Sequence, residues 1–337
     1  MLKIGLIGFG FMGRMHFENY VRLMREGAQV QLTAICDMDI ERLKDQAVKG
    51  NIATEQAQYD LSQFRLYDNI EEMLANEQLD AVDITLPTHL HADVACRVLE
   101  QGLHVLCEKP MALTYEEGVR MAETAARANR KFMVAQCLRF WPAYEYLKAC
   151  VEDGRYGAVK AAYFFRGGAF PGGWYTDKSK SRGNLLDMHI HDVDMVNWLF
   201  GRPAKVSAVG RSVLPGEGYD IVSTHYGYAD GKVVNAQSDW TLEGDFGFEM
   251  TFRVNFERGN LVLDKDGLRD NPEGAQGFKP ELSPDMGYYR EIKYFVEALL
   301  NDAPIETAPP ESTLVTMEIV EAEIQSADRD GDWIKLG

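Results

Sequence analysis

Residues 3–13, with the sequence KIGLIGFGFMG, decide the fold that we expect for this chain. They begin as a short apolar run of strand length and continue into glycines with the spacing G-x-G-x-x-G, namely Gly8, Gly10 and Gly13. A helical pattern over residues 14–25 follows directly. A strand, a glycine turn and a helix in this order are typical of a dinucleotide-binding domain. The glycines allow a tight turn, close approach of a pyrophosphate to the backbone, and close packing of the helix on the sheet.

The acidic residue that should accompany such a turn is Asp37, at the end of a strand predicted over residues 30–36. Its carboxylate can accept hydrogen bonds from both hydroxyls of an adenosine ribose, and it would repel a 2′-phosphate. Met38 and Asp39 offer no cation for such a phosphate, so the sequence predicts NAD as the cofactor rather than NADP. The alternative interpretation is that Asp37 only caps the following helix. The cofactor contacts predicted in this part of the chain are Gly8, Gly10, Phe11, Met12, Gly13 and Asp37.

Strands and helices alternate along the N-terminal part of the chain, which predicts βαβ units and a parallel sheet. The predicted strands cover residues 3–7, 30–36, 81–86, 104–107 and 131–137, and the predicted helices cover residues 14–25, 41–47, 92–100 and 115–128. We therefore predict an α/β fold class, with a Rossmann-type dinucleotide-binding domain over residues 1–130.

The hydrophobic pattern changes after Arg139. A helix is expected from Pro142, since proline suits a first helical turn, and long β-rich segments follow it. Asp230 and Gly231 separate two of these segments and indicate a hairpin, so antiparallel pairing should dominate. This predicts a C-terminal α+β domain over residues 131–337. Its β-rich segments are residues 158–165, 205–213, 222–228, 232–240 and 246–256, and its last helices are residues 288–300 and 312–327.

Composition argues against several classes of partner. The net charge of −17 argues against nucleic acid or an anionic membrane surface, because phosphates repel such a protein. The five cysteines are widely spaced and include no C-x-x-C pair, which indicates a reducing compartment rather than a disulfide framework or a zinc site. The sequence has no apolar run of membrane-spanning length, and its N-terminus lacks the features of a signal peptide. We therefore expect a cytoplasmic protein.

Four further segments resemble one family, the two-domain NAD(P)-dependent oxidoreductases of the Gfo/Idh/MocA type, typified by glucose–fructose oxidoreductase and inositol 2-dehydrogenase. The segments are residues 85–91 (TLPTHLH), 108–110 (EKP), 139–142 (RFWP) and 183–194 (GNLLDMHIHDVD). The resemblance spans the whole chain. It implies a Rossmann-type domain followed by an α/β domain with a large, mostly antiparallel, open-faced sheet. Because that sheet often forms the oligomer interface in the family, we expect a homodimer or homotetramer.

The resemblance also implies roles for single residues. Thr85, Pro87, His91, Glu108 and Lys109 match positions beside the cofactor, although His91 could equally serve only to begin a helix. In family members the Lys, Asp and His at these motif positions form the catalytic triad, which carries over to Lys109, Asp187 and His191. One departure is His189, where many members have glycine, and it leaves the subfamily and the substrate open.

Lys109 follows the strand predicted over residues 104–107, at the edge where open α/β sheets place their ligands. A lysine there can donate to a substrate oxygen, stabilise its developing negative charge and shuttle its proton. The alternative is a surface lysine paired with Glu108, which would contribute little. His191 can act as a base near neutral pH, so the group that carries out the main proton transfer stays open.

A helix predicted over residues 185–200 places Asp187, His191 and Asp194 on one face. They could in principle converge on a metal ion, but hydride transfer to a nicotinamide needs none, so we predict no metal. Asp194 is instead expected to be a structural hydrogen-bonding residue. Trp174 lies in a Gly-rich loop. The predicted substrate contacts are Lys109, Arg139, Trp174, Asp187 and His191.

These features together predict an enzyme that transfers a hydride between NAD and a CH–OH or ketone carbon of a sugar, an inositol or a related polyol. Two alternatives within the same chemistry are an anhydro-sugar and a non-sugar cyclic diol as substrate. A non-catalytic NAD-binding sensor is the alternative from another class. Such a sensor would keep the glycines and lose the proton-handling residues, whereas Lys109, Asp187 and His191 are all present.

Overall fold

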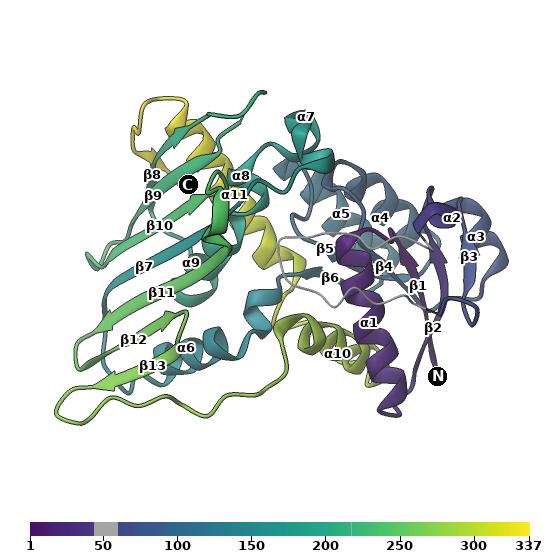
Figure 1. The fold of residues 1–337 in the computed structure, drawn as a ribbon, viewed down its shortest axis with the longest axis horizontal. Helices are drawn as coiled ribbons and strands as arrows, with labels where there is room; N and C mark the ends of the chain where they lie inside the picture. The colour runs from purple at the N-terminus through teal and green to yellow at the C-terminus, as the bar shows by residue number, and fades with distance from the viewer. Residues whose placement is uncertain (44–59, 217) are drawn as a thin grey trace. The chain divides into compact units, whose positions relative to one another are not determined.

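The computed structural model describes residues 1–43, 60–216 and 218–337, and the chain forms two compact units (Figure 1). The first unit comprises Met1–Cys137 and Gly287–Thr313, and the second comprises Leu138–Met286 and Leu314–Gly337. The division thus differs from the predicted boundary after residue 130 in that a later segment of the chain joins the N-terminal unit.

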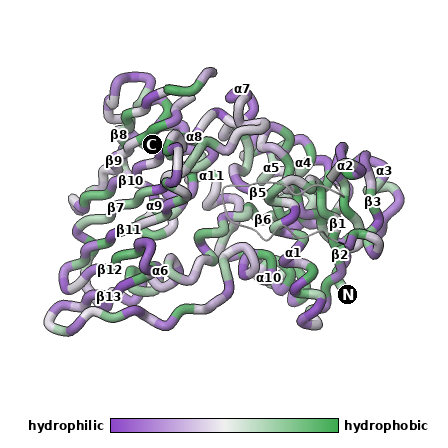
Figure 2. Tube along the Cα trace, in the orientation of Figure 1, coloured by the Kyte–Doolittle hydropathy of each residue, from purple (hydrophilic) through white to green (hydrophobic). Residues whose placement is uncertain are grey.

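The first unit is built on a six-stranded sheet with the order β3-β2-β1-β4-β5-β6, in which every neighbouring pair is parallel. This confirms the predicted parallel sheet. The chain order reverses between β1 and β4, and open α/β sheets bind their ligands at such a switch point. The central strands of this sheet are largely hydrophobic, as β1 shows in Figure 2. Their bounds are β1 Leu2–Ile7, β2 Val30–Cys36, β3 Arg65–Tyr67, β4 Ala81–Ile84, β5 His104–Glu108 and β6 Phe132–Ala135.

Helices connect these strands, and α5 shows how closely the sequence sets them. Thr114 and Glu117 form a capping box at its start, and α5 has the predicted bounds. Strand β3 and helix α3 were not predicted, because both are short. The helix predicted over residues 41–47 starts as α2, but its residues beyond 43 lie outside the described part of the chain. The helices are α1 Phe11–Arg25, α2 Ile40–Leu43, α3 Ile70–Asn76, η1 Thr88–Leu90, α4 His91–Glu100, α5 Tyr115–Ala128 and α10 Gly287–Leu300.

Helix α10 belongs to the first unit although it comes late in the sequence. It packs against α1, where the Arg22 guanidinium lies 3.7 Å from the centre of the Tyr289 ring. The Tyr289 hydroxyl also donates to Glu26 at the end of α1. These contacts, together with the pairing of β6 with β5, explain why the unit extends beyond the predicted boundary.

The second unit is built on an eight-stranded sheet with the order β13-β12-β11-β7-β10-β9-β8-β14. Its pairs are antiparallel except β7 with β10, so the mostly antiparallel sheet is confirmed. The predicted hairpin at Asp230 and Gly231 joins β9 to β10. The strands are β7 Val159–Gly168, β8 Lys205–Arg211, β9 Ile221–Gly227, β10 Val233–Asp239, β11 Phe248–Phe256, β12 Gly259–Asp264, β13 Gly267–Pro272 and β14 Ile334–Lys335.

One face of this sheet is buried, and in the middle of β7 its residues alternate with exposed ones. Ala162 and Phe164 of β7 are buried, whereas Tyr163 between them is 42% exposed. Helix α9 packs against β7 and β10. The helical segments associated with this part of the chain are η2 Cys137–Phe140, α6 Pro142–Asp153, η3 Gly173–Thr176, α7 Lys178–Ser181, α8 Asn184–Asp187, α9 Ile190–Phe200, η4 Gly244–Phe246 and α11 Pro310–Ala327.

The single helix predicted over residues 185–200 is wrong, because the segment breaks into α8 and α9. The N–H groups of Met188 and His189 both bond to the carbonyl of Asn184, at 2.8 and 2.9 Å. The bond from His189 spans five residues rather than four, so the regular helical repeat is interrupted. Asp187 and His191 therefore lie in different helices, and their spacing does not place them on one helical face.

All five cysteines lie in the described part of the chain, where they are buried and form no disulfide. Among the described residues, no helix is long and apolar enough to cross a membrane.

Candidate active site

The glycine turn after β1 has the geometry that a dinucleotide requires. Gly8 has a φ of 96°, a left-handed conformation that favours glycine. A Cβ atom on Gly13 would lie 2.1 Å from the carbonyl oxygen of Gly8, so only glycine lets the helix pack this closely. A Cβ atom on Gly10 would meet no atom within 4 Å, so the space beside it is open. Phe11 and Met12 begin α1, whose N-terminus can hold a phosphate in that space.

Asp37 follows β2 and fixes the backbone around the glycine turn. Its Oδ2 accepts a hydrogen bond of 2.7 Å from the N–H of Phe9, and its Oδ1 accepts one of 2.9 Å from the N–H of Asp39. The second bond is the cap-like contact considered as the alternative. The first shows that Asp37 also ties the end of β2 to the turn, and Met38 beside it is 85% exposed.

The turn after β4 lies at the switch point, next to the glycine turn. Thr85 Oγ1 donates to the carbonyl oxygen of Gly8 at 2.8 Å, which joins the two turns directly. Pro87 precedes η1. His91 starts α4, and its ring nitrogens lie 2.7 Å from the carbonyl of Leu86 and 2.8 Å from that of Pro110.

His91 thus links the turn after β4 to the segment that carries Lys109. Its ring is 1% exposed, and burial lowers its pKa. The structure gives His91 a role in holding backbone together, and its predicted contact with the cofactor stays a prediction.

Lys109 directly follows β5, at the carboxyl edge of the parallel sheet. It is half-buried, whereas its neighbour Glu108 is buried. Glu108 Oε2 accepts a hydrogen bond of 2.9 Å from the N–H of Lys109. Glu108 therefore supports the backbone at Lys109.

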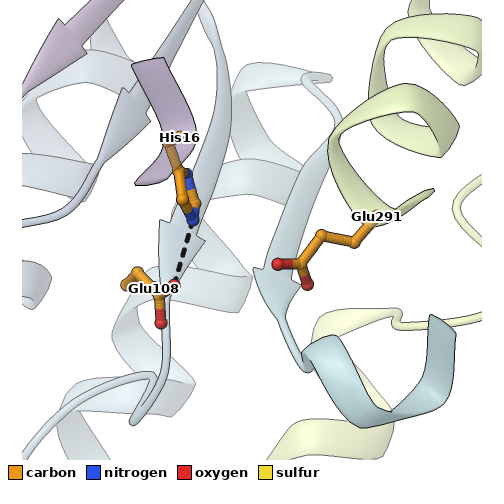
Figure 3. A group of neighbouring side chains, drawn as sticks. All are labelled: His16, Glu108 and Glu291. Carbon is orange, nitrogen blue, oxygen red and sulfur yellow. Dashed lines mark hydrogen bonds and ion pairs between the residues drawn. The ribbon is translucent and has the colours of Figure 1, made fainter. Parts of the chain in front are cut away.

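Glu108 also belongs to a cluster of buried ionisable side chains, which we call the His16 cluster: His16, Asp83, Glu108 and Glu291. Figure 3 draws His16, Glu108 and Glu291. His16 Nδ1 lies 2.8 Å from Asp83 Oδ2, and its Nε2 lies 3.0 Å from Glu108 Oε1. Burial lowers the pKa of His16, but these two carboxylates outweigh it and the pKa is raised well above its ordinary value. Burial, with Glu108 adding to it, raises the pKa of Glu291.

This cluster was not predicted from the sequence, although two signals were present. His16 occupies the apolar face of α1, three residues after Gly13 and one turn before the buried Tyr20. Asp83 is an acidic residue in the otherwise apolar strand β4. A polar side chain on a face that must be buried requires a partner, so each of these residues predicted one.

In the second unit, α8 and α9 carry the other two members of the predicted triad. Asp187 ends α8 and is 8% exposed, while His191 lies in the first turn of α9 and is half-buried. Lys109 belongs to the first unit, so the predicted triad is divided between the two units. The catalytic roles of these residues stay predictions.

Arg139 forms a buried ion pair with Asp194 on α9. Its Nη2 and Nε atoms donate to the two carboxylate oxygens at 2.6 and 2.8 Å, and both side chains are 1% exposed. The Thr316 hydroxyl adds a third bond to Asp194, at 2.8 Å. Asp194 therefore has the structural role expected of it, and it is occupied by these donors instead of converging with Asp187 and His191. The predicted contact of Arg139 with substrate stays a prediction.

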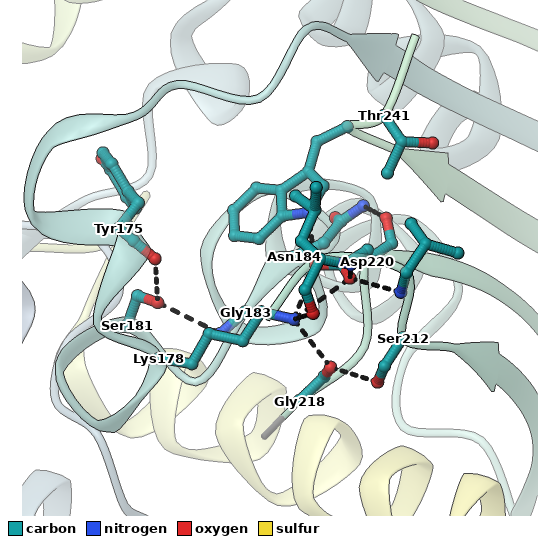
Figure 4. A network of polar contacts seen from close by, with 12 residues as sticks. Tyr175, Lys178, Ser181, Gly183, Asn184, Ser212, Gly218, Asp220 and Thr241 are labelled. Carbon is teal, nitrogen blue, oxygen red and sulfur yellow. Dashed lines mark hydrogen bonds and ion pairs between the residues drawn. The ribbon is translucent and has the colours of Figure 1, made fainter. Parts of the chain in front are cut away.

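The Gly-rich loop that carries Trp174 is anchored by a buried lysine (Figure 4). Lys178 Nζ lies 2.9 Å from Asp220 Oδ1 and also donates to the carbonyl oxygens of Leu214 and Gly218. The indole N–H of Trp240 donates to the same carboxylate at 2.8 Å. Trp174 stacks on Tyr175, with ring centres 4.0 Å apart, and stays half-buried. The loop is thus held by its base and offers an aromatic pair.

His189, which departs from the family pattern, is fully buried beneath the sheet. Its Nε2 lies 3.3 Å from the Thr224 hydroxyl and 3.5 Å from Glu323 Oε2. Burial, with the nearby Arg166 adding to it, lowers the pKa of His189 to about 3. Burial raises the pKa of Glu323 to about 8. His189 therefore packs on β9 and α11 as a neutral side chain.

Comparison with protein families assigns both parts of the chain. The oxidoreductase family with an NAD-binding Rossmann fold, GFO_IDH_MocA, matches residues 2–136. The GFO/IDH/MocA C-terminal domain matches residues 144–262. The chain belongs to the GFO/IDH/MocA oxidoreductase family.

Individual relatives of this GFO/IDH/MocA protein cover nearly all of its length. Uncharacterized oxidoreductase ORF334 of Rhizobium meliloti is 30% identical to it, over 97% of this chain and 98% of its own. D-apiose dehydrogenase of Paraburkholderia graminis is 26% identical, over 99% of this chain and 89% of its own. A solved structure of levoglucosan dehydrogenase in complex with NADH and levoglucosan has a TM-score of 0.84 at 23% identity, with 99% of each chain covered.

Family membership confirms the predicted enzyme class, an NAD-dependent oxidoreductase. The glycine turn and Asp37 are the parts of the described structure that fit NAD. The solved structures confirm the two-part fold, an N-terminal Rossmann-type sheet followed by a mostly antiparallel sheet.

Proposed function

We propose that this GFO/IDH/MocA oxidoreductase transfers a hydride between NAD and a CH–OH or ketone carbon of a sugar, an inositol or a related polyol. The observation that carries the proposal is the position of Lys109 at the carboxyl end of β5, in the E-K-P segment beside the switch point. Two relatives, D-apiose dehydrogenase and levoglucosan dehydrogenase, have names that support this substrate class.

When bound, NAD supplies the acceptor for the hydride that leaves the substrate carbon. The carbon that loses a hydride also requires its hydroxyl to lose a proton, and this is the task of the side chains. Lys109 donates a hydrogen bond to the substrate oxygen and stabilises its negative charge. His191 accepts the proton, and Asp187 orients the imidazole or binds a neighbouring hydroxyl.

Specificity for NAD over NADP rests on Asp37. Its carboxylate is held by the N–H groups of Phe9 and Asp39 beside the open end of the glycine turn. A fixed negative charge there accepts hydrogen bonds from ribose hydroxyls and repels a 2′-phosphate. The exposed Met38 adds no positive charge to offset this repulsion.

The substrate side of the site is proposed to involve Trp174 and Arg139 in the second unit. Trp174, stacked on Tyr175, offers an aromatic face that suits the C–H face of a sugar ring. Arg139 contributes indirectly, through its ion pair with Asp194 on α9, because its guanidinium is bound by that carboxylate and its side chain is 1% exposed. Its contribution is therefore to fix α9 and with it His191.

The open sheet is proposed to pair with a second copy of the chain. Its outward residues include Tyr163, Val209 and Val233, which are 42%, 55% and 51% exposed. Apolar side chains of this size on one sheet face are typical of an interface. Light scattering on the purified protein tests this, since the proposal predicts the mass of a dimer or tetramer and a monomer would contradict it.

The experiment that tests the function is to follow NADH formation over a panel of sugars, inositols, anhydro-sugars and non-sugar cyclic diols. NAD and NADP are supplied in parallel. Turnover of a sugar or polyol with NAD, at a rate well above that with NADP, is the expected result. Turnover of only the non-sugar diols would show that the substrate is a cyclic diol and not a sugar or a related polyol. If no compound in the panel is turned over although the protein binds NAD, the result would instead favour a non-catalytic NAD-binding sensor.

A further inference from the structure

The His16 cluster carries more negative charge than its own residues balance. It contains three carboxylates, from Asp83, Glu108 and Glu291, around the single imidazole of His16. Glu108 is 5% exposed and the other three residues are 0% exposed, so water does not solvate these charges. A buried carboxylate without a compensating positive charge costs several kcal/mol. A cation bound among these side chains would balance this charge.

The three side chains His16, Glu108 and Glu291 are close enough to share one ion. Each offers a ligand atom, and these atoms all lie within 4.8 Å of one another. In a tetrahedral site, metal–ligand bonds of about 2.0–2.2 Å place the ligand atoms roughly 3.3–3.6 Å apart. Movements of less than about 1 Å would thus complete the site. Figure 3 shows the Glu291 carboxylate on α10 directed towards His16 and Glu108.

Two of these ligands are already oriented by neighbours. Asp83 holds the Nδ1 atom of His16 at 2.8 Å, which directs Nε2 towards the two glutamates. The N–H of Lys109 holds one oxygen of Glu108 at 2.9 Å and leaves the other for the cluster. A carboxylate behind a histidine and a donor behind a carboxylate are the usual outer partners of metal ligands.

Glu291 is the independent observation that indicates a ligand. It is 0% exposed, and neither of its carboxylate oxygens has a hydrogen-bond partner among the residues that the structure describes. Buried polar atoms are almost always satisfied, so an unpartnered carboxylate directed into a cluster of ligand atoms indicates a missing partner. An ion bound between Glu291, Glu108 and His16 would satisfy it.

We propose that His16, Glu108 and Glu291 bind one divalent transition-metal ion. The nitrogen ligand favours an ion such as Zn²⁺ over Mg²⁺ or Ca²⁺, which prefer oxygen alone. The ion would connect α1, the end of β5 and α10, all within the first unit, and it is independent of the proposed substrate class. It stabilises the backbone that leads into the E-K-P segment, and hydride transfer does not require it. The site differs from the absence of metal predicted from the sequence, which concerned Asp187, His191 and Asp194.

The test is to remove metal from the purified full-length protein with a chelator and to titrate Zn²⁺ by calorimetry. The expected result is one tight site per chain in the wild type. Glu291→Gln keeps the shape of the side chain but removes its charge, and it should weaken this site at least about tenfold. Glu297→Gln is the matched control, because Glu297 is an exposed glutamate on the same helix and its variant should bind like the wild type.

Affinity that is unchanged in Glu291→Gln would overturn the proposal, because the ion would then bind elsewhere on the acidic surface. The absence of a tight site in the wild type would overturn it as well. If Glu291→Gln does not fold, the thermal unfolding midpoint of the wild type, measured at increasing Zn²⁺ concentration, tests the proposal. A bound ion raises the midpoint with its concentration, and Mg²⁺ at the same concentration should raise it less.

Discussion

The two units bury ionisable side chains in opposite ways. In the second unit, Arg139 pairs with Asp194, Arg166 with Asp192 and Lys178 with Asp220, one cation for each carboxylate. In the first unit, the His16 cluster gathers three carboxylates around one imidazole. A structural role is enough to explain the balanced pairs, since each buried charge is neutralised by its partner. It is not enough to explain the unbalanced cluster, which for that reason indicates a ligand.

A third arrangement, in the second unit, shows how a buried acid is tolerated without a cation. Glu323 is buried beside His189, whose pKa of about 3 makes it a neutral neighbour. Glu323 keeps a proton instead, because burial raises its pKa to about 8. Burial raises the pKa of Glu291 in the same way, but the other two acids of the His16 cluster, Asp83 and Glu108, still share a single imidazole.

Breaking a balanced pair should have the largest effect. Asp194→Ala removes the carboxylate that accepts two hydrogen bonds from the buried guanidinium of Arg139, and it should destabilise the second unit by about 3–5 kcal/mol. All five tryptophans lie in this unit, so their fluorescence during urea unfolding reports on it. A loss below about 1 kcal/mol would show that the pair is dispensable and that charge balance is a poor guide here.

Removing the protonated acid should have a smaller effect, and one that depends on pH. Between pH 6.5 and 8, Glu323 is ionised in the unfolded chain but still protonated in the folded one, so folding loses stability as the pH rises. Glu323→Gln removes this dependence. The variant should gain about 1–2 kcal/mol on the wild type across this range in the same fluorescence assay. A constant difference would mean that Glu323 is ionised in the folded protein.

The smallest effect is expected for an exposed pair. Glu152 lies 3.3 Å from Lys148, one turn away on α6, and its side chain is 64% exposed. Glu152→Gln should change the stability of the second unit by no more than about 0.5 kcal/mol, because solvent screens the pair. An effect as large as that of Asp194→Ala would show that burial does not determine how much an ion pair contributes to stability, which would contradict the comparison of the two units.

Local patterns of sequence predicted most of the fold. The alternation of apolar strands and helices identified the parallel sheet, and the Asp230–Gly231 signal identified the β9–β10 hairpin. Short elements such as β3 were not predicted, because three residues are too few to show a hydrophobic repeat. The break between α8 and α9 was not predicted either, because it depends on the Asn184 carbonyl, which accepts bonds from two successive N–H groups.

The site was predictable only where motif and backbone coincide. The glycine turn and Asp37 lie where the sequence placed them, because their roles follow from local geometry. The pairing of Arg139 with Asp194 could not be read from the sequence, because 55 positions separate the two residues. His16 and Glu291 are still farther apart along the chain, and only the packing of α10 on α1 brings them into one cluster.

The central claim is that Lys109 handles the substrate oxygen, and a substrate found in the panel allows a direct test. We would measure turnover and NAD affinity for wild type, Lys109→Met and, as a control, Lys265→Met, which changes an exposed lysine in the turn after β12. The account predicts that Lys109→Met lowers turnover roughly a hundredfold or more while NAD affinity stays within about threefold. The control should behave like the wild type. Wild-type turnover in Lys109→Met would contradict the account.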